Sequence, residues 1–70
     1  METVKGYVDH IIYYKKENGY TVLSLICEGE ELVCVGSFRS VEAGETLELE
    51  GSYVEHPIYG HQLKVEKCRV

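Results

Sequence analysis

Alternation of apolar and polar residues with a period of two is the feature that most restricts the fold of this chain. In residues 46–53, every second residue is Leu, Gly or Tyr, and the residues between them are polar. Near the C-terminus, Leu63 and Val65 alternate with polar residues in the same way. Because successive side chains of a strand point to opposite faces, both segments are predicted to be half-buried strands.

Three further segments have strand-like sequences. Residues 32–38 alternate but are apolar on both faces, which is typical of a central strand. Residues 21–27 are rich in leucine and β-branched residues. Residues 3–14 also alternate, but the run from 11 to 14 breaks the pattern and predicts a bulge or a bend between two sheets. Gly6 fits a tight barrel corner, where a side chain would collide with the neighbouring backbone.

Turn-forming residues separate these segments into five predicted strands. They lie at residues 17–19, 28–30, 43–45 and 56–60. Ser40 to Ala43 is the one helix candidate, a single turn between the third and fourth strands. Five antiparallel strands without a covering helix bury their apolar faces best by closing into a barrel. We therefore predict one all-β domain over residues 1–70, a five-stranded antiparallel OB-fold-like barrel. An SH3-like barrel remains the alternative, because periodicity does not give strand order.

Composition and the N-terminal residues restrict the class of protein further. An apolar fraction of 44% and a charged fraction of 27% are those of a folded globular domain. The apolar runs are far shorter than a membrane span requires, so no membrane partner is expected. Residues 1–5 show no basic region followed by an apolar block, so we expect no secretory signal and a cytoplasmic location.

The sequence offers no catalytic residue, metal site or cofactor site within this chain. The cysteines, Cys27, Cys34 and Cys68, form no CxxC pair, which disfavours structural zinc. A disulfide between Cys27 and Cys34 is disfavoured in a reducing cytosol, so free thiols are expected. No serine lies in a nucleophile elbow, and the histidines have no evident third group. A phosphate-binding GxxxxGK[ST] loop is absent from the sequence, which excludes ATP binding by this chain.

A local contact with single-stranded DNA is the sharpest functional hypothesis from the residues themselves. The net charge of -5 opposes general attraction to phosphate, so any contact needs a local basic patch. OB folds bind single strands between two loops, with bases stacked on aromatic rings. The candidate residues here are Lys15, Lys16, Tyr20, Tyr59, His61 and Lys64. The simpler interpretation is that these lysines keep a loop soluble and that the tyrosines pack in the core.

Several short blocks give the chain a resemblance to a known family. The blocks are Gly6-Tyr7-Val8 with Ile11-Ile12, Asn18 to Val22, Val35-Gly36, Gly44-Glu45 leading to Leu49 to Gly51, and His56 to Leu63. In this order they resemble the N-terminal OB domain of the RecD-like (RecD/TraA-type) ATP-dependent DNA helicases that act without RecB and RecC. Two departures are Tyr53, where the family tends to have tryptophan, and Leu63, where it tends to have phenylalanine.

The resemblance implies a larger parent protein whose motor domains bind ATP and Mg²⁺ and unwind DNA with 5'-to-3' polarity in recombination and repair. This chain would be its non-catalytic N-terminal OB domain. It would position the motor domains or contact a replication or repair protein, with a weak contact to single-stranded DNA. The alternative is a free-standing OB-fold module that binds single strands or another protein.

Overall fold

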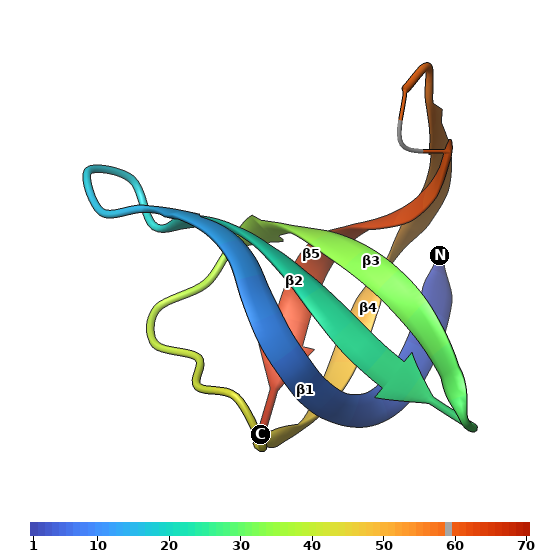
Figure 1. Ribbon diagram of the computed structural model, residues 1–70, viewed down its shortest axis with the longest axis horizontal. Coiled ribbons are helices and arrows are strands. Elements are labelled where there is room, and N and C mark those ends of the chain that lie inside the picture. Colours follow the sequence, from blue (N-terminus) through green and yellow to red (C-terminus); the bar gives the residue numbers. More distant parts are fainter. Residues whose placement is uncertain (59) are drawn as a thin grey trace.

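The computed structural model describes residues 1–58 and 60–70, which form a closed barrel of five strands (Figure 1). The strands are β1 (Glu2–Lys15), β2 (Tyr20–Cys27), β3 (Glu30–Ser37), β4 (Thr46–His56) and β5 (Gly60–Arg69). Around the barrel they follow the order β1-β2-β3-β5-β4, and β4 pairs back onto β1. β3 and β5 are parallel, and the other neighbours are antiparallel. This arrangement is that of an OB fold, and it decides between the two predicted barrels.

β1 serves both halves of the barrel because it bends along its length. Its first half, as far as Tyr7, pairs with β4, and its second half pairs with β2. Its pairing with β2 shifts register between Val8 and His10 and again between Ile11 and Tyr13. The second shift confirms the bulge predicted from the broken alternation. A β-carbon at Gly6 would overlap the backbone of Ile26, as the predicted barrel corner requires.

The core lies inside the barrel and follows the predicted alternation. The buried apolar residues of the described chain include Val8, Leu23, Leu25, Cys34, Phe38, Leu47, Leu49 and Leu63. Tyr53 continues the period of Leu49 but is 42% exposed, because the β4–β5 hairpin extends past the end of the barrel (Figure 1). Gln62 was placed on the outer side of β5 by the same alternation, yet it is 7% exposed.

The predicted helical turn at Ser40 to Ala43 is wrong. Residues 38–45 form an irregular loop, and no helix occurs within residues 1–58 and 60–70. The loop is held by the backbone of Val8, whose N–H donates to the Glu45 carbonyl at 2.8 Å and whose carbonyl accepts from Gly44 at 2.7 Å. These bonds tie the loop to β1 and take the place of a helical turn. Accordingly, no described helix is long and apolar enough to cross a membrane.

Candidate nucleic-acid interface

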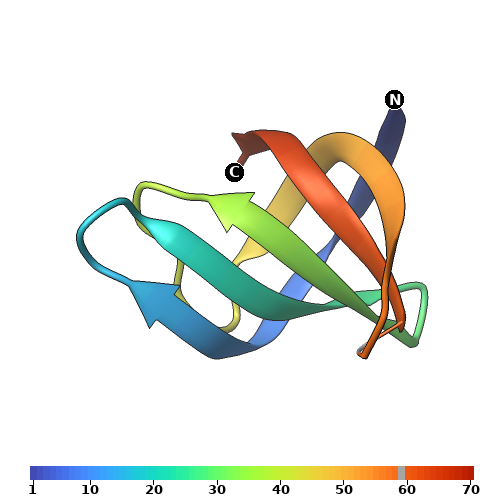
Figure 2. The ribbon, with the colours of Figure 1, turned by 90° about the horizontal axis from the view of Figure 1, so that it is seen from above.

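The outside of β1, β2, β3 and β5 forms a surface that we call the outer face. Its residues are Ile12, Tyr13, Lys15, Tyr20, Val22, Val33, Val35, Gln62 and Lys64. They share a side because they lie opposite one another in the ladders, as Lys15 does with Tyr20 and Val33 with Gln62. Figure 2 looks onto this side, with the β1–β2 loop at one end and the β4–β5 hairpin at the other.

Two tyrosines stand at the edge of the outer face nearest the β1–β2 loop. The rings of Tyr13 and Tyr20 meet edge to face, with centroids 6.3 Å apart and planes at 61°. Tyr13 is 52% exposed and Tyr20 is 38% exposed, so neither ring is packed into the core. Exposed rings next to a lysine, here Lys15, have the composition of a platform on which bases stack.

The β1–β2 loop is built to hold Tyr20 in place. Gly19 has φ of +71°, and its carbonyl accepts from the Phe38 N–H and from the Thr21 hydroxyl, each at 3.0 Å. The Asn18 side-chain oxygen accepts from the N–H of Tyr20 at 3.0 Å. These bonds fix the backbone at the start of β2, from which the Tyr20 side chain projects.

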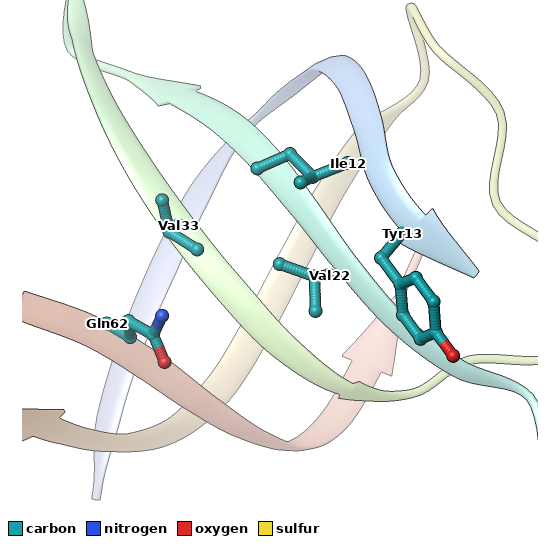
Figure 3. A pocket seen from close by; sticks show the side chains of 5 residues that line it. All are labelled: Ile12, Tyr13, Val22, Val33 and Gln62. Atoms are coloured by element: carbon teal, nitrogen blue, oxygen red, sulfur yellow. The ribbon is translucent and has the colours of Figure 1, made fainter. Parts of the chain in front are cut away.

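Two hollows lie next to each other on the outer face. One, of about 410 Å³, is bordered by Tyr20, Val35, Val54, Lys64 and Glu66 among others. The other, of about 330 Å³, is lined by Ile12, Tyr13, Val22, Val33 and Gln62 (Figure 3). The first carries one charge of each sign, Lys64 and Glu66. The second has no charged residue in its lining, so its contact with a ligand would be apolar except at Gln62.

The structure brings together three of the six predicted site residues. Lys15, Tyr20 and Lys64 lie on the outer face, and Lys16 lies in the exposed loop beside it. Tyr59 lies outside the described residues.

His61 lies elsewhere, because its neighbour Gln62 is the residue that faces the outer side. The His61 ring stacks on Tyr53 with centroids 4.7 Å apart, and its Nδ1 lies 3.1 Å from a Glu55 carboxylate oxygen. Both partners belong to the opposite side of the β4–β5 hairpin, where Glu55 faces His61 and Tyr53 faces Leu63.

Sequence reasoning missed the apolar floor of the outer face, formed by Ile12, Val22, Val33 and Val35. A signal for it existed, since residues 32–38 were found to be apolar on both faces. In a closed barrel one of those faces is the exterior, and apolar side chains there are available to a ligand. Gln62 gave no comparable signal, because its burial depends on the pairing of β5 with β3.

The described residues also include one group that could hold a metal ion. Asp9, His10 and Glu31 bring possible ligand atoms within 4.8 Å of one another, and all three are exposed. His10 Nδ1 is 2.9 Å from Asp9, and Glu31 accepts a hydrogen bond from the buried hydroxyl of Ser24 at 2.5 Å. These internal contacts account for the arrangement without a metal.

Comparison with known proteins places the chain in a family. No curated protein and no solved structure matches it. One family model matches residues 1–70, and it describes the OB-fold domain of the ATP-dependent DNA helicase YrrC. The closed five-stranded barrel agrees with that description. The chain therefore belongs to the family of OB-fold domains of the DNA helicase YrrC.

Proposed function

We propose that this domain holds single-stranded DNA on its outer face for the helicase to which it belongs. The observation that carries the proposal is the pair of exposed tyrosines, Tyr13 and Tyr20, on the same side of the barrel as Lys15 and Lys64. A single strand needs these two elements, aromatic rings for its bases and cations for its phosphates. The surface also lies between the two loops that OB folds use for such ligands.

For the parent protein, the proposal is a RecD-like helicase with 5'-to-3' polarity that acts in recombination or repair. Its motor domains would bind ATP and Mg²⁺, and this domain would position them and hold the strand that they move along. Support comes from the helicase family of the domain and from its resemblance to the RecD-like branch. The chain itself supplies no catalytic group in this proposal.

Charge limits how tightly the domain binds. The net charge is -5, and the cations close to the outer face are Lys15, Lys16 and Lys64. Each phosphate neutralised on a single strand contributes about -0.7 to the slope of log K against log salt. Contact with these three lysines therefore gives a slope of about -2. The domain is expected to bind weakly and to lose most of its affinity at moderate salt.

The test is fluorescence anisotropy of a labelled single-stranded oligonucleotide titrated with the domain at several salt concentrations. Replacing Lys15 and Lys64 together by Gln is expected to reduce the salt slope by about 1.4, since two phosphate contacts are lost. Tyr20→Ala is expected to lower affinity about 5- to 150-fold, the range for one stacked base. Lys5 and Lys67, replaced together by Gln, form the matched control, because they lie opposite Glu48 and Glu50 where β1 and β5 pair with β4.

A second candidate is the docking of a protein segment, from the rest of the helicase or from a replication or repair partner. The apolar floor of the outer face and the acidic net charge favour it. The same titration separates the two candidates. If the native domain binds no oligonucleotide at low salt, or if the control pair weakens binding as much as the Lys15 and Lys64 pair, the DNA proposal fails and docking takes its place.

A further inference from the structure

The hollow lined by Ile12, Tyr13, Val22, Val33 and Gln62 has a polar group at one end and apolar walls. Its lining comes from four strands, with Ile12 placed there by the second bulge of β1. Figure 3 shows the Gln62 amide beside Val33, across the hollow from the Tyr13 ring. The volume of about 330 Å³ lies at the lower end of the range for small-molecule sites. A hollow of this volume can hold one small chemical group.

Gln62 is the unusual residue of this hollow. Its side chain is 7% exposed, yet its amide makes no hydrogen bond with any other residue that the structure describes. Gln62 lines the hollow, and no atom of its amide is both sealed from solvent and unpaired, so the amide is open to solvent. Because this amide is open to solvent, a ligand that displaces water from it loses affinity unless the ligand provides a hydrogen-bonding partner in its place. A ligand that enters the hollow can supply that partner.

The chemistry of the lining selects the class of ligand. The walls are neutral and apolar, and the amide offers one acceptor and two donor hydrogens. A nucleobase matches both, because it has apolar faces and a polar edge that carries donors and acceptors. The Tyr13 ring at the rim supplies a surface against which the base stacks. A phosphate has no partner inside the hollow, and Lys15, two residues from Tyr13 on the same face, is the nearest cation along the strand.

We propose that this hollow takes one unpaired base of the bound strand, with the edge of the base hydrogen-bonded to the Gln62 amide and its face against Tyr13. The inference rests on the proposed function, since it specifies how the outer face holds single-stranded DNA. A primary amide can turn to present either a donor or an acceptor, so it matches the edge of each of the four bases. The pocket is therefore expected to bind each of the four bases without selecting among them.

The experiment compares a short labelled oligonucleotide with versions in which a single abasic site is moved along the sequence. For the native domain, an abasic site at the position held in the pocket is expected to reduce affinity about 5- to 150-fold, the range for one base. Gln62→Leu keeps the side-chain size and removes the amide. It is expected to weaken binding of the intact oligonucleotide about 10-fold, the effect of losing about 1.4 kcal/mol.

Two features of the Gln62→Leu variant separate a base contact from a general loss of structure. It is expected to bind the abasic oligonucleotide as well as the native domain does, and to keep the native salt slope, because an amide carries no charge. Val22→Leu is the second variant, since it narrows the hollow by one methylene without touching Gln62. Val22→Leu should weaken binding of the intact oligonucleotide and leave binding of the abasic oligonucleotide unchanged. Thr3→Leu is the control and should leave binding unchanged, because Thr3 is an exposed residue of β1 that lies opposite Glu50, away from the hollow.

The outcomes for the pocket and for the proposed function are distinct. If the native domain binds the oligonucleotide but every abasic position and Gln62→Leu leave the affinity unchanged, the pocket inference is overturned and the proposed function stands. If the native domain binds no oligonucleotide at all, the proposed function fails and the inference fails with it. An apolar side chain of a protein segment would then be the occupant of the hollow.

Discussion

Cys34 lies inside the barrel, where an ionised thiol would have no partner. It is fully buried, and its Sγ points to the Leu32 carbonyl at 3.7 Å. Burial raises the pKa of this thiol to about 12, and the nearby Cys27 adds to the effect. In the unfolded chain the thiol ionises near its ordinary pKa of 9.0. The folded state therefore holds the proton more tightly than the unfolded state between these two values.

The sign of the pH effect follows directly. The contribution of Cys34 to the free energy of unfolding is complete below pH 9 and is lost as the pH rises from about 9 toward about 12. Urea denaturation at pH 8 and at pH 10.5 measures this loss. Cys34→Ala is the comparison, because it removes this one titration and leaves all the others. Equal pH dependence in the two proteins would contradict the prediction.

Among the elements, β4 depends on Gly51 for its place in the barrel. The β4–β5 ladder shifts register between Glu50 and Gly51, and a β-carbon at Gly51 would overlap the Lys64 carbonyl of β5. Gly51→Ala is expected to lower the free energy of unfolding by about 1–3 kcal/mol, the range for overpacking. The next residue, Ser52, is exposed, so Ser52→Ala is the control and should change it by less than about 0.5 kcal/mol. Equal urea midpoints for the two variants would contradict this account.

Elements with strong periodicity were predictable from the sequence, and a segment without it was not. Residues 46–53 carry an alternation that any strand pairing preserves, and the broken alternation around Ile12 located the bulge in β1. Strand order followed only from the structure, because it depends on contacts between distant segments. Residues 40–43 were misassigned because the backbone of Val8 binds their loop, and hydrogen bonds of that kind leave no mark on a local pattern.

At the scale of the whole molecule, the candidate site was predictable only where one strand or hairpin determines it. Lys15 and Tyr20 face each other across the β1–β2 turn, so their proximity follows from a hairpin visible in the sequence. Gln62 meets Val33 through the parallel pairing of β5 with β3, which the sequence does not encode locally. His61 was assigned because it follows the last loop, which flanks the groove of an OB fold, and the alternation of β5 turns it to the other side.

The whole barrel also depends on a small core, and Leu49 is one of its fully buried leucines. Leu49 is fully buried in β4, opposite Val4 of β1 and Cys68 of β5, so its side chain supports both ladders of β4. A core of this size rarely supplies more than about 3–5 kcal/mol of net stability. Replacing a buried leucine by alanine costs about 2–5 kcal/mol. Because the two ranges overlap, Leu49→Ala is expected to leave a large fraction of the molecules unfolded at 25 °C.

Far-UV circular dichroism during urea titration measures this fraction. Val54→Ala is the control, since Val54 is 36% exposed and should keep a transition close to that of the native domain. A Leu49→Ala transition at the native midpoint would mean that the stability of the barrel comes from its backbone ladders and not from its core. The expected loss of stability would instead mean that packing of the core determines the stability of the barrel. Substitution of half-buried outer residues such as Val22 and Val33 is therefore expected to cost less stability than substitution of a leucine inside the barrel.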